Sequence, residues 1–167
     1  LPYEKYYDVN IIKEATEYEI EYWYKLYLNI KKNKLKLNTF DLPKKIFKKL
    51  VDDRNWLILE LKLKKEYQED AVDTPLSICF IHKSKNNISP IFLGLDYDYF
   101  EQFKPYRQNL FQVIKQGVKL DVDNIYLGME AGLEKSRFGA TLLKKSAYIQ
   151  TNESYNLERL NIFAVTK

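Results

Sequence analysis

The first part of the chain alternates between strand-like and helix-like spacing of hydrophobic residues. Residues 6–12 are rich in aromatic and β-branched side chains, which predicts a first strand. Thr16 and Glu19 then form a Thr-x-x-Glu capping box, the signature of a helix start. Hydrophobic residues follow it at helical spacing, namely Ile20, Trp23, Tyr24, Tyr27 and Ile30. A second helix is expected to begin near Pro43 and to end around 52–54, because proline suits a first turn and a hydrophobic stripe follows it.

From residue 56 the hydrophobic spacing changes from helical to alternating. A leucine occupies every second position from 57 to 63, so we expect a strand with one well-buried face. Two further strands are expected at 76–82 and 89–97, because both stretches are rich in β-forming residues. The short, turn-rich link at 84–87 suits a hairpin, so these strands should be antiparallel neighbours.

Helical spacing returns after Pro105 and gives way to short hydrophobic runs toward the end of the chain. The face of this helix that should meet the sheet carries Leu110, Phe111, Ile114, Gly117 and Val118. A short buried strand is expected at 125–128, parallel to the strand that ends near residue 96, because a helix connects the two. A short helix at 133–140 and closing strands at 147–149 and 160–165 complete the predicted order of elements.

These elements predict an α+β fold in which a mixed, mostly antiparallel sheet of about six or seven strands is flanked by helices. With 167 residues, the whole chain 1–167 fits one domain that can bury roughly two thirds of its unfolded surface. The chain begins with Leu1 rather than Met, which suggests a longer parent chain with a neighbouring domain or a partner enzyme.

The composition excludes several classes of site and partner. One cysteine, Cys79, lies in a hydrophobic run and one histidine is present, so neither a disulfide framework nor a structural zinc site is expected, and we expect no metal. No apolar stretch approaches the roughly 20 residues that a membrane span requires, so we expect no membrane partner and a cytoplasmic location. The net charge of +4 rests mainly on lysine, with only four arginines, so nucleic acid is an unlikely partner.

Two blocks of residues indicate a family. Residues 126–130 and 134–140, with Lys135 followed by Phe138 and Gly139, resemble the segment after the fifth strand of GNAT superfamily acyltransferases. Within that superfamily the block is similar to the acetyltransferase-like domains associated with biotin-synthesis-type synthases, and more distantly to the Fem-type aminoacyl transferases. Residues 92–97 and 106–108 resemble the fourth strand and the start of the following helix in the same branch. The predicted order of elements also agrees with the GNAT fold along nearly the whole chain.

The resemblance implies an acyltransferase that moves an acyl group from a thioester donor, such as acetyl-CoA or another acyl-CoA, to an amine acceptor by direct attack. In the GNAT fold the fourth and fifth strands splay apart, and backbone groups exposed there bind the donor. The residues expected to bind the donor are Leu93, Gly94, Leu95, Tyr106, Arg107, Gln108 and Asn109.

Acyl transfer to an amine also requires a proton acceptor and groups that stabilise the carbonyl oxygen as it gains charge. The candidate catalytic residues are Asp96 at the end of a strand, Glu130 after the fifth strand, and Lys135 in the groove of the related domains. The candidate acceptor-binding residues are Tyr97, Tyr99 and Arg137. Each also has an ordinary structural reading, since carboxylates form caps and turns, aromatic residues fill cores, and lysine and arginine side chains are usually solvated.

The chain departs from the GNAT pattern where the pyrophosphate of coenzyme A would bind. Enzymes of the superfamily that use acetyl-CoA usually carry a glycine-rich turn there, whose amides hold the pyrophosphate at a helix N-terminus. Residues 96–108 contain no glycine, although Arg107 and the helix dipole could still hold an anion. Two alternatives therefore stay open: a noncatalytic recognition module that works with a partner enzyme, and an RNA-contacting domain that uses the lysines between 31 and 49.

Overall fold

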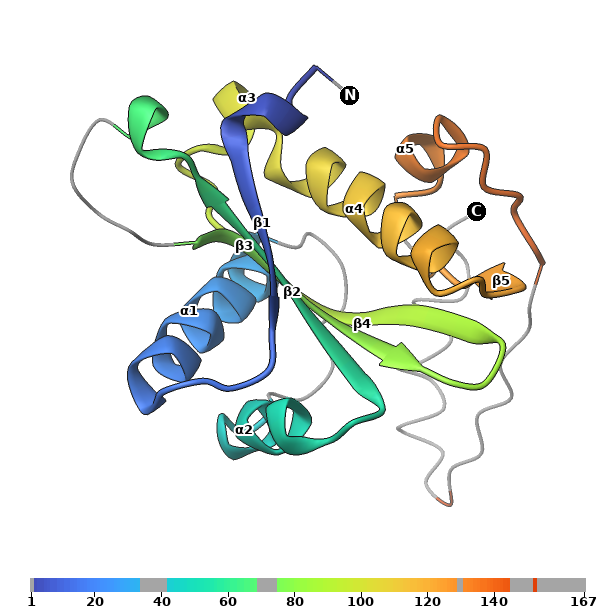
Figure 1. Ribbon diagram of the computed structural model, residues 1–167, viewed down its shortest axis with the longest axis horizontal. Coiled ribbons are helices and arrows are strands. Elements are labelled where there is room, and N and C mark those ends of the chain that lie inside the picture. Colours follow the sequence, from blue (N-terminus) through green and yellow to red (C-terminus); the bar gives the residue numbers. More distant parts are fainter. Residues whose placement is uncertain (1, 34–41, 69–74, 129–130, 145–151, 153–167) are drawn as a thin grey trace.

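In the computed structural model five strands form one sheet, and helices lie on both of its faces (Figure 1). The structure describes residues 2–33, 42–68, 75–128, 131–144 and 152. The strands are β1 (Tyr7–Ile12), β2 (Trp56–Leu63), β3 (Pro75–Lys83), β4 (Asn87–Leu95) and β5 (Asn124–Ile125). The helices are α1 (Glu17–Asn33), α2 (Lys45–Asp52), α3 (Phe100–Phe103), α4 (Pro105–Lys119) and α5 (Gly132–Ser136). Two short 3-10 helices are also present, η1 (Glu4–Tyr6) and η2 (Lys65–Tyr67).

The strands lie in the order β1-β2-β3-β4-β5. The first four pair antiparallel, and β5 pairs with β4 in parallel. These pairings confirm the mixed, mostly antiparallel sheet, the hairpin between β3 and β4, and the parallel strand after α4 that the sequence predicts. The described residues form five strands rather than six or seven, and the predicted strands at 147–149 and 160–165 lie outside the described residues.

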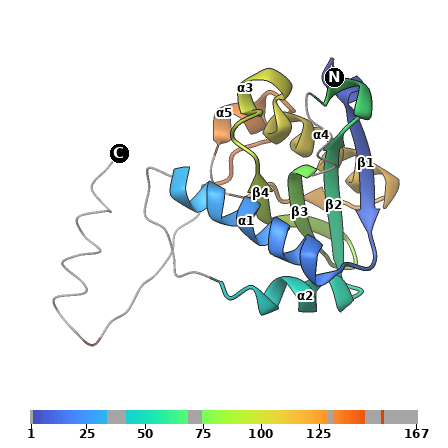
Figure 2. The same ribbon diagram turned by 90° about the vertical axis from the view of Figure 1, so that its left-hand side faces the viewer.

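The two faces of the sheet are covered by different helices. Ile58 of β2 belongs to a hydrophobic cluster with α1 and α2, whereas its neighbours Leu57 and Leu59 belong to a cluster with Val113 of α4. Because successive side chains of a strand point to opposite faces, α1 and α2 lie on one face and α4 on the other (Figures 1 and 2). Among the described residues, no helix has the length and hydrophobicity of a membrane-spanning segment.

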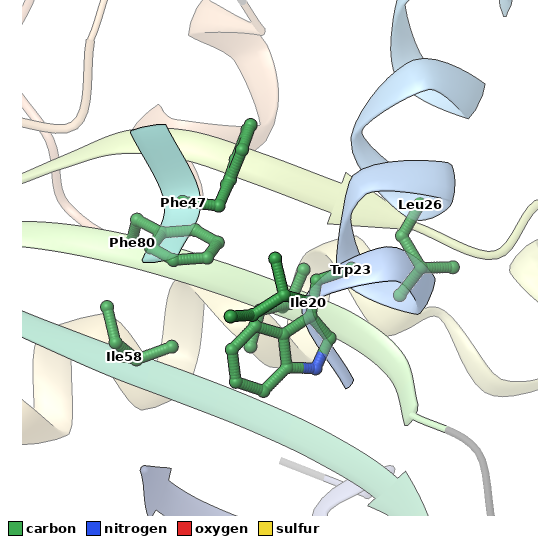
Figure 3. Close-up of a cluster of buried hydrophobic side chains, with 7 residues drawn as sticks. Ile20, Trp23, Leu26, Phe47, Ile58 and Phe80 are labelled. Atoms are coloured by element: carbon green, nitrogen blue, oxygen red, sulfur yellow. The ribbon is translucent and has the colours of Figure 1, made fainter. Parts of the chain in front are cut away.

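The capping box and the hydrophobic stripe of α1 are confirmed. Thr16 N donates to Glu19 Oε2 at 2.7 Å, and Glu19 N donates to Thr16 Oγ1 at 3.2 Å. The buried side of α1 contributes Ile20, Trp23 and Leu26 to the first cluster (Figure 3). Phe47 of α2 and Phe80 of β3 meet them there, and the Trp23 and Phe80 rings lie edge to face with centroids 6.0 Å apart. This packing fixes α1 across the sheet.

Strand β2 is buried on both of its faces, because helices cover both sides of the sheet. Glu60, in the middle of β2, is only 2% exposed. Its carboxylate accepts hydrogen bonds from Trp23 Nε1 at 3.2 Å and from Asn10 Nδ2 at 3.3 Å, and Lys62 Nζ lies 3.8 Å away. A buried carboxylate is tolerated when such partners replace water, so Glu60 ties α1 to β1 and β2.

The face of α4 that meets the sheet also differs from the prediction. Leu110 and Gly117 are buried as expected, but Val118 is 75% exposed. Buried polar residues replace the missing hydrophobic ones: Asn109 Nδ2 donates to Ser77 Oγ at 2.9 Å, and Gln112 Nε2 donates to Glu4 Oε1 at 2.9 Å. Hydrophobic spacing alone misplaced this face, since side chains that find polar partners across the interface can be buried too.

Gly94 of β4 provides a test of the packing between α1 and the sheet. A Cβ atom at this position would lie 2.7 Å from Leu26 Cβ, 2.8 Å from Ile78 Cγ2 and 2.9 Å from Tyr27 N. Because two of these atoms cannot move without moving the backbone of α1, Gly94→Ala should lower the free energy of unfolding by about 1–3 kcal/mol. Urea unfolding followed by circular dichroism measures this change.

Gly132→Ala is the matched control for Gly94→Ala. Its nearest contact would be the flexible tip of Leu142, at 3.3 Å, so its free energy of unfolding should change by less than about 0.5 kcal/mol. Equal effects of the two substitutions would contradict the close approach of α1 to Gly94.

Candidate functional site

Strand β5 stays paired with β4 over only two residues. Asn87 pairs with Asn124 and Ile88 with Ile125, and Tyr126 N then donates to Ile88 O at 2.9 Å. β4 continues to Leu95, and among the described residues no strand pairs with this side of β4 beyond Ile88. The predicted divergence of two similarly directed strands is therefore present, and along the second half of β4 it leaves an edge that no described strand covers, called the open edge below.

A β-bulge in β4 determines which backbone groups face this open edge. Ile81 of β3 pairs with Pro90, and the next residue of β3, Phe80, pairs with Phe92, so Ile91 is the extra residue. Proline is common at such positions because a bulge does not need its missing N–H. Ile91 is also 52% exposed, so the bulge lies at the surface.

Beyond the bulge, the backbone of Leu93 and Leu95 points toward the open edge. Asp96 N donates to Leu76 O at 2.9 Å, so the backbone of Asp96 faces β3. The N–H and C=O groups of successive residues in a strand point alternately to its two sides, which turns those of Leu95 and Leu93 away from β3. Consistent with this direction, Asn29 Nδ2 of α1 donates to Leu95 O at 3.3 Å. Leu93 is thus the predicted donor-binding residue whose backbone is best placed.

Gly94 has a packing role in the structure. It is buried beneath Leu26 and Tyr27 of α1, and alternation directs its backbone toward β3 rather than toward the open edge. Its missing side chain allows α1 to cross β4 closely, beside the gap that opens where β4 and β5 diverge.

The segment between β4 and α4 contains a short helix in place of a glycine-rich turn. Helix α3 is tied to the sheet, since Tyr7 Oη of β1 donates to Phe103 O at 3.0 Å. Lys104 joins α3 to α4 with φ of 50°, a left-handed conformation in which glycine would be usual. Pro105 then begins α4, so the N-terminus of this 15-residue helix lies beside the end of β4.

Three predicted donor-binding residues at the start of α4 have different environments. Asn109 is buried against Ser77. Gln108 is fully buried on the same side of α4 as Gln112, and neither of its side-chain polar atoms has a hydrogen-bond partner. Arg107 is 39% exposed and extends toward α5, where its Nε lies 4.0 Å from Glu134 Oε2. Of the three, Arg107 alone reaches the surface.

Asp96 lies half-buried at the end of β4. Its Oδ1 accepts a hydrogen bond from Asp98 N at 3.0 Å, which closes a turn. Burial raises the pKa of the Asp96 carboxyl and outweighs the Asp98 N–H bond that lowers it, and the nearby Asp98 carboxylate raises it further. A carboxylate with a raised pKa is a better proton acceptor, so its position and its environment both suit a general base.

The two candidate acceptor-binding tyrosines, Tyr97 and Tyr99, lie between the end of β4 and the start of α3. The Tyr97 ring stacks on Phe100 with centroids 5.4 Å apart, and burial raises the pKa of its hydroxyl. Tyr99 packs against Phe103, with centroids 6.1 Å apart, on the edge of the hydrophobic cluster around Tyr7 and Leu61. Tyr97 therefore borders the end of β4, whereas Tyr99 also supports the core.

Lys135 is buried rather than solvated, with only 8% of its surface exposed. It lies on α5 and its Nζ approaches Gly128, the third residue after the paired part of β5, where an added Cβ would be 3.8 Å away. Glu130 lies outside the described residues. Arg137 is exposed and forms an ion pair with Glu134. The structure thus places an ammonium group close to the end of β5 and a surface ion pair beside it.

Sequence reasoning missed several of these features. Helix α3 has no clear periodic signal because it spans only four residues, 100–103. Asn29 and Glu134 were not singled out, although both contact the predicted site residues Leu95 and Arg107. Their contacts join residues far apart in sequence, so no local pattern could have found them.

Comparisons with known proteins identify the fold. No protein-family model and no curated protein matches the chain. The structure is similar to the aminoglycoside acetyltransferase meta-AAC0020 from an uncultured soil metagenomic sample in complex with sisomicin, with a TM-score of 0.63 and 10% identity over 89% of this chain and 99% of that chain. It is also similar to aminoglycoside N-acetyltransferase AAC(6')-Iy in complex with CoA, with a TM-score of 0.58 and 8% identity over 87% and 95% of the two chains.

A third similar structure is the ribosomal-protein-S18-alanine N-acetyltransferase from Escherichia coli, with a TM-score of 0.54 and 11% identity over 80% of this chain and 74% of that chain. These likenesses confirm that the chain has the GNAT fold. They do not distinguish the biotin-synthase-associated or Fem-type branch from other members of that fold.

The raised pKa of Asp96 can be measured directly. In an NMR titration of side-chain carboxyl carbons, Asp96 should titrate above the usual range of aspartate, because burial disfavours its charged form. Asp98→Asn should lower the Asp96 pKa, since it removes a neighbouring negative charge and keeps the backbone N–H that bonds Oδ1. An Asp96 pKa at or below the usual value would refute the account of its environment.

Proposed function

We propose that the protein is an acyltransferase that moves an acyl group from a thioester donor, such as acetyl-CoA or another acyl-CoA, to an amine. The observation that carries this proposal is the open edge of β4 beside the N-terminus of α4. The backbone N–H and C=O of Leu93 face that edge, and such groups can pair with the amide groups of a pantetheine arm as they would with another strand. A solved structure of the same fold, AAC(6')-Iy, contains CoA.

The proposed reaction is a direct transfer without an acyl-enzyme intermediate. An acceptor that arrives as an ammonium cation first loses a proton to water. The lone pair of the neutral amine attacks the thioester carbonyl carbon, a carbon–nitrogen bond forms, and the carbon–sulfur bond then breaks to release the thiolate. The amine nitrogen gives its proton to the Asp96 carboxylate, and the Asp96 carboxylic acid returns that proton to the thiolate, so the products are an amide and a thiol. Asp96 suits this role because burial raises its pKa toward that of the group it deprotonates.

Lys135 is proposed to stabilise negative charge on the carbonyl oxygen. A buried ammonium group attracts a developing oxyanion more strongly than one in water, because the dielectric constant around it is lower. Its position close to the end of β5 places it on the side of the gap opposite β4. Glu130 is proposed as a second catalytic carboxylate that could accept the amine proton.

The acceptor is proposed to be an amine, carried by a small molecule. Two of the similar structures are aminoglycoside acetyltransferases, and meta-AAC0020 was solved with sisomicin. In this chain Asp96 and Asp98 place negative charge where a cationic amine would arrive, and beside them lies the Tyr97 ring, whose π-face can attract a cation. Tyr99 and Arg137 are also proposed to contact the acceptor.

The two other readings of the sequence are less well supported. The RNA-contacting hypothesis relies on lysines between 31 and 49, but Lys44 pairs with Glu21 and Lys48 pairs with Glu17. These pairs reduce the charge available to phosphates. A noncatalytic recognition module would not require a half-buried carboxylate with a raised pKa at the open edge. A cytoplasmic location, a neighbouring domain or partner enzyme, and the biotin-synthase-associated branch stay proposals.

Binding and turnover test the proposal. Isothermal titration with acetyl-CoA and longer acyl-CoAs, followed by mass spectrometry of an amine panel, should detect donor binding and an acyl-mass increase of the acceptor. Absence of both would remove the proposed function.

Asp96→Asn should reduce kcat roughly a hundredfold to ten-thousandfold, because an amide cannot accept the amine proton. The matched control is Asp98→Asn, which changes the same kind of side chain two residues away. Its kcat should stay within about twofold of the unmodified protein at a pH well above the Asp96 pKa. Initial rates of thiol release measure both variants, and equal losses would exclude Asp96 as the base.

Lys135→Met should lower kcat roughly a hundredfold, since methionine retains the apolar stem and loses the charge that faces the oxyanion. Lys85→Met, in the exposed turn between β3 and β4, is the control and should not change kcat. Near-ultraviolet circular dichroism checks that the Lys135 variant is folded. If the folded variant keeps full activity, Lys135 is a structural residue.

A further inference from the structure

The N-terminus of α4 is the place where the fold could hold the pyrophosphate of a nucleotide-containing donor. Free backbone N–H groups and the helix dipole make such a terminus an anion site. In any helix the first four N–H groups precede the first intrahelical bond, and in α4 they belong to residues 104–107. Of these, Pro105 has no N–H, and Lys104 N already donates to Phe100 O at 3.1 Å. At most two of the first four backbone N–H groups could therefore meet a phosphate.

The charges around this terminus are also unfavourable for a pyrophosphate. The segment from the end of β4 into α4 carries three carboxylates, on Asp96, Asp98 and Glu101. Its two cations already have acidic neighbours: Lys104 forms an ion pair with Glu101, and Arg107 Nε lies 4.0 Å from Glu134 Oε2. The guanidinium of Arg107 also extends over the Phe138 ring, 6.0 Å from its centroid, toward α5. A multiply charged anion would meet net negative charge.

In contrast to the charged N-terminus of α4, the open edge of β4 is uncharged. It presents peptide N–H and C=O groups at Leu93, and the flanking positions are hydrophobic side chains of β4. A pantetheine arm is uncharged and contains two amide groups, so this edge can bind it through strand-like hydrogen bonds without any phosphate contact.

We infer that the protein recognises its donor through the acyl-pantetheine arm and that the nucleotide contributes little to binding. This inference rests on the proposed acyltransferase function and names the class of donor for it. The same arm occurs in coenzyme A and in the prosthetic group of acyl-carrier proteins, and the acylated forms of both carry the acyl group as a thioester on the thiol of that arm.

The test compares three acetyl donors with the full chain and one amine acceptor. These are acetyl-CoA, acetyl-pantetheine, which lacks the phosphates and the nucleotide, and an acetyl-carrier protein. The kcat/KM for acetyl-pantetheine should lie within about tenfold of that for acetyl-CoA, because the deleted groups make few contacts. A carrier-protein value above that of acetyl-pantetheine assigns the natural source to a carrier, and a lower value assigns it to coenzyme A.

A preference for acetyl-CoA over acetyl-pantetheine of more than about tenfold overturns the inference and leaves the proposed function intact. Absence of transfer from every donor removes the proposed function and the inference with it.

Glu101→Gln gives an independent test of the electrostatic part. Glu101 is highly exposed, so folding should not change, and the substitution frees Lys104 and removes one negative charge. The kcat/KM for acetyl-CoA should rise several-fold, while that for acetyl-pantetheine stays constant. The control is Glu14→Gln, in the exposed loop after β1 at the opposite end of the sheet from α3, which should leave both values unchanged (Figure 1). If the ratio of kcat/KM for acetyl-CoA to kcat/KM for acetyl-pantetheine is unchanged in the Glu101 variant, the inference is contradicted.

Discussion

The short pairing of β5 with β4 is the constraint on which the rest of the site depends. Gly117 of α4 has no side chain, and a Cβ there would lie only 2.4 Å from Ile125 Cδ1 and 3.3 Å from Ile88 Cδ1. The Ile125 side chain thus packs directly against the α4 backbone and fastens the start of β5 between the helix and the first residues of β4. Beyond this point the hydrogen bonding between the strands ends, and no strand of the described residues pairs with that side of β4.

The other elements around the gap are arranged by similarly local contacts. The bulge at Ile91 shifts the alternation of β4 by one residue, so that Leu93 and Leu95 rather than Phe92 and Gly94 direct their backbone outward. On the other side, α1 can cross β4 closely because Gly94 has no side chain. Asn29 of α1 then satisfies Leu95 O, so the site is bounded by packing as well as by hydrogen bonds.

Electrostatics divides this site into two parts with different character. The peptide edge of β4 is neutral, whereas the segment that follows it carries carboxylates whose neighbouring cations are already engaged. Burial of Asp96 makes its proton affinity higher than that of an exposed aspartate, which links its position at the strand end to a chemical role. This division agrees with the proposed substrates, an uncharged thioester arm and an amine that arrives as a cation.

The sequence by itself determined the elements whose signals are local. The capping box at Thr16, the hairpin between β3 and β4, and the parallel placement of β5 after a helix all follow from short patterns, and the structure agrees with each. The sequence also singled out Asp96 from its place at a strand end, whereas Leu93 was expected only through the resemblance to the GNAT fold, and both site assignments stay predictions. Periodicity is a property of one segment, so it describes elements better than it describes their neighbours.

Tertiary structure alone decided which polar residues are buried and which backbone groups face the gap. Glu60 and Asn109 can be buried because their hydrogen-bond partners, Trp23 and Ser77, are supplied by distant parts of the sequence. Lys135 is buried although its sequence context is typical of a solvated lysine. The physical reason is common to these cases: the cost of burying a polar group depends on the partner it finds, and that partner comes from another part of the chain.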